Sequence, residues 1–317
     1  MQAPDFWRTQ PGFCAYLLSP LGLIYSRISD SRSARQPAYK SNLPVICIGN
    51  VVMGGAGKTP VVQSLAHSLK SRNLHILTRG YGGQEAGPLL VDPDRHTAHD
   101  VGDEALLHAR TAPTWIARDR VAGCKAAEAG GAGVILMDDG FQNSSLHKTL
   151  SLLVVDSDYG FGNGLPFPAG PLRGTVTRSL SRADAIILIG NAPMELHGYT
   201  GPVFRARIAP TDTTAFRGAS VVAFSGIGRP EKFFRTLTES GASIRARRAF
   251  ADHHPFTRAE IQELVAQADT EKARLVTTEK DIVRVPSDLQ SMVQVLTVRL
   301  QWENNGDLLD MIEQANV

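Results

Sequence analysis

A glycine-rich stretch between residues 49 and 60 has the residue types and the spacing that bind a polyphosphate. It reads Gly49-Asn-Val-Val-Met-Gly-Gly-Ala-Gly-Lys-Thr-Pro60, after the apolar run 43–48 and before the periodic apolar residues of 61–69. This pattern predicts a strand, a loop and a helix, in which backbone N–H groups turn towards the anion and the helix presents its positive end. We expect nucleotide binding by Gly54, Gly55, Ala56, Gly57, Lys58, Thr59 and Pro60.

Two residues of this loop have specific expected roles. Lys58 would reach the β- and γ-phosphates, and the Thr59 hydroxyl would bind Mg²⁺. The usual pattern G-x-x-x-x-G-K-[ST] has glycine where this chain has Val52, although the other glycines leave the loop free to turn. The alternative interpretation is an ordinary strand-to-helix turn. Gly-Lys-Thr directly after a strand, with a good helix behind it, favours nucleotide phosphates.

A pair of carboxylates ends another apolar run, Val134-Ile-Leu-Met-Asp-Asp-Gly-Phe-Gln142. In a nucleotide-binding α/β sheet this position lies beside the phosphate loop, where an aspartate holds Mg²⁺ directly or through water. We therefore expect Asp138 and Asp139 to serve the metal, with Asp138 favoured for the contact. A strand-terminal turn is the alternative, because Asp-Asp-Gly also suits turns.

Three further side chains are candidates for phosphoryl transfer. Asp103 opens a predicted helix, where it is an adequate N-cap, but a carboxylate there could equally accept the proton of an attacking hydroxyl. Arg79 and Arg173 lie in the glycine-rich loops Thr78-Arg-Gly-Tyr-Gly-Gly83 and Pro168-Ala-Gly-Pro-Leu-Arg-Gly174. Each could clamp a phosphate, or simply be a solvated arginine on a loop.

The second half of the chain offers two adjacent histidines and a polar turn. His253 and His254 have no partner at i, i+4, so metal ligation is not expected. A histidine in a turn is the ordinary reading, but a histidine beside Asp252 could orient a base across a cleft. The turn at 277–281 could touch a nucleotide, and it lacks the Asn-Lys-x-Asp arrangement typical of guanine binding.

These residues must be positioned by alternating strands and helices. After the phosphate loop, the pattern predicts strands at 74–78, 114–117, 134–137, 150–156 and 185–189, and helices at 103–110 and 118–129. Such alternation is typical of an α/β fold with a mostly parallel sheet and ligands at the carboxyl ends of its strands.

The chain then predicts a connector and a second series of the same kind. Residues 200–216 are interpreted as the connector, and further elements are expected at 220–228, 229–239, 257–268, 274–278 and 293–298. We therefore predict a phosphate-loop kinase domain over residues 41–215 and a smaller α/β domain over 216–317, preceded by a distinct segment over 1–40.

The segment 1–40 contains an apolar run of about 13 residues, 13–25, that Pro20 is expected to break, followed by four basic residues. A spanning helix needs about 20 apolar residues, so this run is too short to cross a bilayer. It also lacks the order of charges expected of a signal peptide. Apolar and aromatic residues beside arginines favour a segment lying in an anionic membrane surface, and a helix packed on the protein body is the alternative.

Composition excludes several classes of protein. With 43 % hydrophobic and 20 % charged residues, the 317-residue chain is predicted to be globular and long enough for two domains. A net charge of +2 indicates no nucleic-acid partner. The three cysteines have no zinc spacing and suit a reducing compartment.

Taken in order, these motifs resemble the tetraacyldisaccharide 4′-kinases, the lipid A pathway kinases of Gram-negative bacteria. The resemblance rests on six pieces spread over most of the chain: the loop 49–60, Thr78-Arg-Gly-Tyr-Gly82, Gly102-Asp-Glu104, Asp138-Asp-Gly-Phe-Gln142, Pro168-Ala-Gly-Pro-Leu-Arg173 and Asp252-His253. Each piece is weak, whereas their combination is specific.

The resemblance implies transfer of a phosphoryl group from ATP, with Mg²⁺, to the 4′-hydroxyl of a tetraacylated glucosamine disaccharide 1-phosphate, which gives lipid IVA. It implies a monotopic enzyme on the cytoplasmic face of the inner membrane, with a lipid substrate. No obligate protein partner is evident from the sequence. The implied roles are the base for Asp103, assisted by His253, and stabilisation of the γ-phosphoryl charge for Arg173. Substrate binding is implied for Arg79, Tyr81 and Gln142.

Two other classes remain open on the residues alone. A membrane-associated phosphate-loop ATPase that works as a switch would hydrolyse ATP without phosphorylating a lipid. A kinase of a soluble metabolite would keep its activity without residues 1–26.

Overall fold

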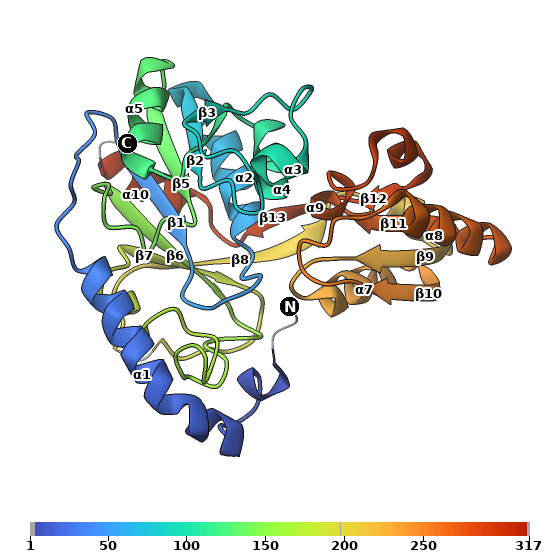
Figure 1. Ribbon diagram of the computed structural model, residues 1–317, viewed down its shortest axis with the longest axis horizontal. Helices are drawn as coiled ribbons and strands as arrows, with labels where there is room; N and C mark the ends of the chain where they lie inside the picture. The colour runs from blue at the N-terminus through green and yellow to red at the C-terminus, as the bar shows by residue number, and fades with distance from the viewer. Residues whose placement is uncertain (1–3, 197, 316–317) are drawn as a thin grey trace.

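The computed structural model describes residues 4–196 and 198–315, so the ends of the predicted segments 1–40 and 216–317 lie outside the described residues. Figure 1 shows two sheets side by side, each covered by helices, with β8 extending from the larger sheet towards the smaller one. The strands of both sheets run mostly parallel, as the predicted α/β fold requires.

The larger sheet has nine strands in the order β13-β8-β7-β6-β1-β5-β2-β4-β3. Its central strands are buried apolar runs because helices cover both faces of the sheet. Their bounds are β1 Val45–Gly49, β2 Leu74–Thr78, β3 Leu89–Leu90, β4 Thr114–Ile116, β5 Val134–Asp138, β6 Leu150–Asp156, β7 Ala185–Ile189, β8 Val203–Pro210 and β13 Val298–Trp302.

The larger lobe also contains seven α-helices among its described residues. They are α1 Phe13–Ser33, α2 Lys58–Ser68, α3 Ala98–Val101, α4 Asp103–Ala109, α5 Arg120–Ala129, α6 Val176–Leu180 and α10 Gly306–Gln314. Helix α2 buries Val61, Val62, Leu65 and Ala66 in the main hydrophobic cluster of the lobe, so the helix that follows the phosphate loop is packed against the sheet.

The smaller lobe is built on the sheet β10-β9-β11-β12, all of whose neighbouring strands pair in parallel. The strands are β9 Ser220–Ser225, β10 Ser243–Ala249, β11 Arg274–Thr278 and β12 Gln294–Leu296, and the helices are α7 Pro230–Glu239, α8 Arg258–Thr270 and α9 Glu279–Ile282. One hydrophobic cluster contains residues of both lobes, including Val101 and Leu106 from the first and Phe224 and Phe256 from the second.

The structure differs from the sequence-based division in two places. Residues 203–210 were interpreted as part of a connector, yet they form β8, which pairs with β7 and β13 and buries Phe204 and Ala206. The end of the chain was grouped with the second lobe, yet β13 and α10 pack with the larger lobe, where Leu308 and Ile312 join the main cluster. Burial alternates along the start of β8, so that strand leaves no continuous apolar signal. The pairing of β8 with β13 joins segments that are remote in sequence, and a local pattern does not show it.

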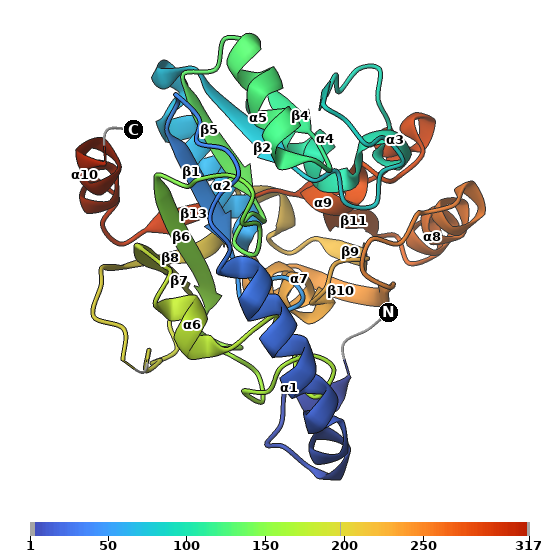
Figure 2. The same cartoon turned by 60° about the vertical axis from the view of Figure 1, so that its left-hand side comes forward.

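Helix α1 continues through Pro20, so the expected break is absent. It buries Ala15, Gly22 and Ser26, and most of its large apolar side chains are exposed. Figures 1 and 2 show α1 at the periphery of the larger lobe. No helix in the described part of the chain is long and apolar enough to cross a membrane.

Candidate active site

The phosphate loop connects β1 to α2 at the point where the sheet topology reverses, since β5 and β6 flank β1 on opposite sides. Gly57 has φ +86°, a conformation that glycine adopts without steric cost, and helix α2 begins at Lys58. Asn50 organises the loop, because its amide donates to the carbonyl oxygen of Val52 at 2.7 Å and its Oδ1 accepts from Lys58 Nζ at 3.2 Å. The lysine is thus held over the loop.

The acidic pair lies directly beside this loop. Asp138 ends β5 and is in register with Ile48 of β1, so its carboxylate is next to the start of the loop. Asp138 is buried, with Oδ2 3.3 Å from His108 Nε2, and its Oδ1 has no hydrogen-bond partner among the described residues. A buried carboxylate oxygen without a partner is a candidate cation ligand.

Asp139 instead faces two cations. Arg173 Nη1 donates to both of its carboxylate oxygens at 2.9 and 3.0 Å, and Lys58 Nζ lies 3.4 Å from Oδ1. Burial alone would raise the pKa of Asp139, but the charges of Lys58 and Arg173 outweigh it and lower that pKa. Asp139 therefore holds the arginine and the lysine of the phosphate site together as an ionised carboxylate.

The predicted base and its histidine meet across the two lobes. Asp103 is the first residue of α4 and is 3 % exposed, and its oxygens lie 2.9 and 3.1 Å from Nδ1 of His253. His253 has φ +60°, a left-handed conformation that is uncommon for a residue other than glycine and is frequent at functional sites. His254 bonds Glu260 in its own lobe, so the two adjacent histidines have different partners.

Asp103 is surrounded by hydrogen-bond donors. The backbone N–H of Glu104 donates to its Oδ1 at 2.8 Å, and Arg284 Nε lies 3.3 Å from its Oδ2. Burial tends to raise the pKa of Asp103, but the hydrogen bond with His253 and the charges of Lys280 and Arg284 lower it overall. Asp103 is consequently ionised at neutral pH, which is the form that can accept a proton.

Glu104 links this pair to the phosphate loop. Its Oε1 accepts a hydrogen bond from the Thr59 hydroxyl at 3.4 Å and lies 3.1 Å from Lys280 Nζ of the smaller lobe. Of the two adjacent carboxylates of α4, Asp103 therefore faces His253 and Glu104 faces Thr59. A group held between them would touch both the phosphate loop and the base.

The three residues predicted to bind substrate, Arg79, Tyr81 and Gln142, differ in their contacts with the Asp103–His253 pair. The ring of Tyr81 lies edge-on to that of His253 at 5.3 Å between centroids, and its side chain is 65 % exposed. Arg79 is exposed. Gln142 is half-buried, and its Oε1 has no hydrogen-bond partner among the described residues. Tyr81 is therefore the one of the three with a contact to the Asp103–His253 pair.

Sequence reasoning did not single out several residues of the site. Asn50, His108, Lys280 and Arg284 all contact a predicted site residue. Lys280 lies within the polar turn 277–281 that was noted at a strand end, so its place was indicated but its role was not. His108 and Arg284 are separated from their partners by 30 residues or more, which short motifs do not capture.

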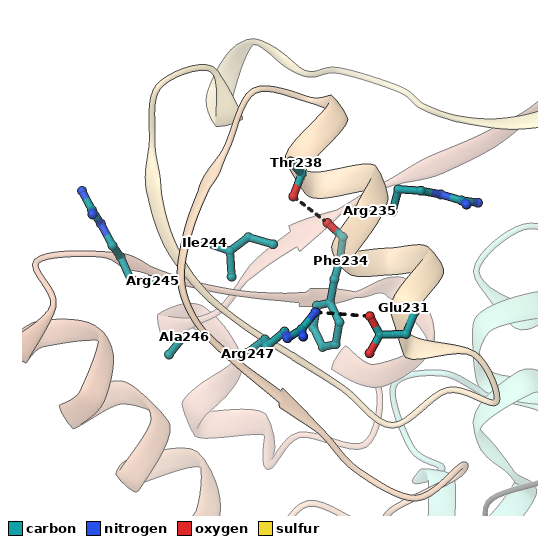
Figure 3. Close-up of a pocket in the computed structure, with 8 residues that line it drawn as sticks. All are labelled: Glu231, Phe234, Arg235, Thr238, Ile244, Arg245, Ala246 and Arg247. Carbon is teal, nitrogen blue, oxygen red and sulfur yellow. Dashed lines mark hydrogen bonds and ion pairs between the residues drawn. The ribbon is translucent and has the colours of Figure 1, made fainter. Parts of the chain in front are cut away.

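A cavity of about 470 Å³ lies elsewhere, between α7 and β10 of the smaller lobe (Figure 3). Arg247 and Glu231 form an ion pair at 3.3 Å within it. None of the predicted site residues lines this cavity. It is therefore separate from the phosphate loop and the Asp103–His253 pair.

Known proteins resemble this chain along almost all of its length. Residues 14–316 match the protein family described as Tetraacyldisaccharide-1-P 4'-kinase. A tetraacyldisaccharide 4'-kinase of Paramagnetospirillum magneticum is 50 % identical, covering 100 % of this chain and 99 % of the relative. Another from Rhodospirillum centenum is 49 % identical, covering 98 % and 96 %.

A solved structure shows that the architecture is shared as well. The crystal structure of LpxK from Aquifex aeolicus in complex with ATP is 26 % identical, with a TM-score of 0.76, and the match covers 95 % of this chain and 99 % of that one. The family match and the two relatives near 50 % identity span the phosphate loop, the acidic pair and the histidine turn. The chain therefore belongs to the tetraacyldisaccharide-1-P 4'-kinase family.

Proposed function

We propose that the chain transfers the γ-phosphoryl group of ATP to the 4′-hydroxyl of a tetraacylated glucosamine disaccharide 1-phosphate, a step of lipid A biosynthesis. The relatives are named for this kinase activity, and the Aquifex structure is a complex with ATP. The observation that carries the proposal is the meeting of Asp103 and His253 beside a phosphate loop whose Thr59 contacts the next carboxylate, Glu104.

In the proposed mechanism, Asp103 accepts the proton of the attacking 4′-hydroxyl. His253 assists by donating to the carboxylate from its Nδ1 position and by holding it in place. Lys58 and Arg173 stabilise the negative charge of the γ-phosphoryl group, and both are oriented by Asp139. Phosphoryl transfer depends on positioning and electrostatic stabilisation more than on covalent chemistry. A carboxylate base, a lysine and an arginine are therefore the types of group that the reaction needs.

The donor set also fits Mg²⁺, which this fold family uses with ATP. Mg²⁺ prefers oxygen ligands and usually keeps several waters, so one or two protein oxygens and the nucleotide complete its shell. Asp138 offers a buried oxygen without a partner, and Thr59 offers a hydroxyl. Bound there, the ion would neutralise phosphate charge. We propose Asp138 and Thr59 as its ligands, with Asp139 able to join them if Arg173 moves to the phosphate.

The acceptor is a lipid, and α1 is suited to meet it. Its exposed apolar side chains include Phe13, Tyr16, Leu17, Leu21 and Ile24, each more than half exposed. Basic residues follow the apolar stretch, as expected of a helix lying in an anionic interface. We propose that the chain is a peripheral protein of the cytoplasmic face of the inner membrane and that α1 provides the attachment.

The test is an assay of the purified full chain with γ-labelled ATP, Mg²⁺ and the detergent-dispersed disaccharide 1-phosphate. We expect label in the lipid, and a fall of about 100-fold or more for Asp103→Asn and for Lys58→Ala, because each removes a group needed in the transition state. Asp288→Asn, which removes an exposed carboxylate, is the control.

Label appearing only as inorganic phosphate would contradict the kinase and favour an ATPase switch. Undiminished activity of Asp103→Asn with wild-type affinity for ATP would contradict the assignment of the base while leaving the kinase in place. A kinase of a soluble metabolite would label a soluble acceptor instead of the lipid.

A further inference from the structure

Lys280 is a nearly buried cation that the proposed mechanism does not use. It lies in the short helix α9 of the smaller lobe, and its side chain is 19 % exposed. Its Nζ is 3.1 Å from Oε1 of Glu104 and 3.5 Å from Nε2 of His253. Lys280 therefore touches the far side of the histidine whose Nδ1 faces Asp103.

The backbone that carries Lys280 is firmly held. The Thr278 hydroxyl accepts from the backbone N–H of Asp281 at 3.1 Å, which caps α9. The buried Asp281 carboxylate accepts from the Ser225 hydroxyl at 2.8 Å and from the N–H of Gly226 at 3.0 Å. The carbonyl oxygen of Gly226 in turn accepts from the N–H of His253 at 3.0 Å. Lys280 and His253 are thus fixed relative to each other through one backbone segment.

An ammonium group can only donate hydrogen bonds, so the ring nitrogen that faces it must accept. Nε2 of His253 therefore carries a lone pair, and the ring proton is placed on Nδ1, where it donates to Asp103. We propose that Lys280 is a positioning residue that selects this tautomer of His253. This inference rests on the proposed role of Asp103 as the base.

A competing acceptor makes the selection necessary. Oδ2 of Asp252 lies 3.8 Å from the same Nε2 atom, and its Oδ1 has no hydrogen-bond partner among the described residues. Without Lys280, the carboxylate of Asp252 would attract a proton to Nε2, because a carboxylate accepts and cannot donate. Because Asp103 also accepts at Nδ1, a single ring proton on Nδ1 would then no longer be specified, and the orientation of the Asp103–His253 pair would be perturbed.

The charges around the pair agree with this role. Burial tends to lower the pKa of Lys280, but Glu104, Asp103 and Asp252 raise it overall, so the lysine is charged. Lys280 in turn is one of the groups that lower the pKa of Asp103, together with His253 and Arg284. The titratable or charged groups that face His253 are Asp103, Asp252 and Lys280, with the phenol-bearing ring of Tyr81 at its edge.

The tautomer can be observed directly in the folded protein. Selective ¹⁵N labelling of histidine in the full chain, with the His253 signals assigned by their loss in His253→Asn, reports which ring nitrogen carries the proton. We expect the proton on Nδ1 and a lone pair on Nε2 in the wild type. In Lys280→Met we expect a proton on Nε2. A wild-type ring protonated on Nε2 would overturn the proposal without bearing on whether the chain is a kinase.

Kinetics provide the second measurement. We expect Lys280→Met to lower kcat at least about tenfold, with the KM for ATP changed less than about twofold, because orientation of the base is lost and nucleotide binding is not. The acid limb of kcat should move to higher pH, since removal of the cation raises the pKa of Asp103.

Two variants complete the design. Lys280→Arg retains a donor-only cation, so it should restore the Nδ1 tautomer and most of kcat. Arg258→Met removes an exposed cation of the same lobe, paired with Asp288, and should change neither readout. Equal losses in Lys280→Met and Lys280→Arg, or an unchanged His253 spectrum and pH profile in Lys280→Met, would contradict the role. An inactive wild type with the expected tautomer would overturn the proposed function instead.

Discussion

Asp103 and Asp139 are carboxylates of the proposed site, and each faces cations or hydrogen-bond donors. Asp103 contacts Arg284 and His253, and Asp139 contacts Lys58 and Arg173. For both, burial opposes ionisation and the neighbouring positive groups outweigh it, so both pKa values lie below their usual value. These groups therefore link the stability of the fold to pH.

The stability contributed by Asp103 should be lost in acid. Because its folded-state pKa is lowered, the contribution is fully present above its unfolded pKa of about 3.9 and disappears as the pH falls through the folded value. We expect Asp103→Asn to lower the free energy of unfolding by about 1–3 kcal/mol at pH 7, since buried Arg284 loses one of its two carboxylate contacts, and by less at pH 3. Urea unfolding at several pH values measures this.

The matched control is Asp288→Asn, at an exposed pair with Arg258, which should give a smaller effect at pH 7. A difference between Asp103→Asn and the wild type that stays constant, or grows, as the pH falls would show that the Asp103 carboxylate does not stabilise the fold.

Helix α1 connects the proposed lipid contact to the phosphate site. The hydroxyl of Ser29 donates to the backbone carbonyl oxygen of Arg173, and the ring of Tyr25 lies edge-on to that of Phe167, 5.5 Å between centroids. The loop that carries Arg173 is therefore packed directly under α1. Movement of α1 on binding a membrane would therefore be transmitted to the loop that carries Arg173, whose side chain pairs with Asp139.

Removing the exposed apolar side chains of α1 should weaken membrane binding. Leu17, Leu21 and Ile24 are 67, 56 and 57 % exposed, so changing all three to Ser should leave the fold intact. Each buried leucine or isoleucine is worth about 1.5–3 kcal/mol, so partitioning to anionic vesicles should fall at least about 100-fold. Vesicle sedimentation measures the partitioning.

The control is the pair Leu90→Ser and Met292→Ser, which removes exposed apolar side chains away from α1. If the control reduced partitioning as much as the triple variant, attachment through α1 would be wrong. If neither did, another surface would hold the protein on the membrane.

The two lobes contact each other through the phosphate loop itself. Arg229, which precedes α7, donates to the carbonyl oxygen of Gly55 and lies 2.6 Å from Asp156 Oδ2 at the end of β6. Lys232 of α7 contacts the same buried carboxylate. The phosphate loop of the larger lobe is therefore supported by a cation of the smaller lobe, so its order depends on how the two lobes pack.

Breaking this contact should weaken ATP binding. We expect Arg229→Met to raise the Kd for ATP about tenfold, or ~1.4 kcal/mol, because the loop loses a support that comes from outside its own lobe. Arg235→Met, which removes a 60 % exposed cation of helix α7, should leave the Kd within about twofold. Calorimetric titration measures both values, and equal changes in the two variants would contradict a specific role of Arg229.

The sequence was sufficient to predict the α/β fold, the strand, loop and helix that surround the glycine-rich stretch, the position of the acidic pair at the end of β5 and the helix that starts at Asp103. Those features rest on local patterns, because an apolar run followed by glycines or carboxylates is readable over about ten residues. The same local reading misplaced β8 and the strand and helix at the end of the chain, whose pairing partners are remote in sequence.

The partners of each functional side chain depend on the packing of the two lobes. Asp103 and His253 are 150 residues apart, and Lys280 reaches Glu104 across 176 residues. Which of the two adjacent histidines contacts Asp103 likewise depends on which ring faces α4 and which faces Glu260. Such contacts arise only where the two lobes pack against each other, and no spacing along the chain encodes the distances that this packing sets.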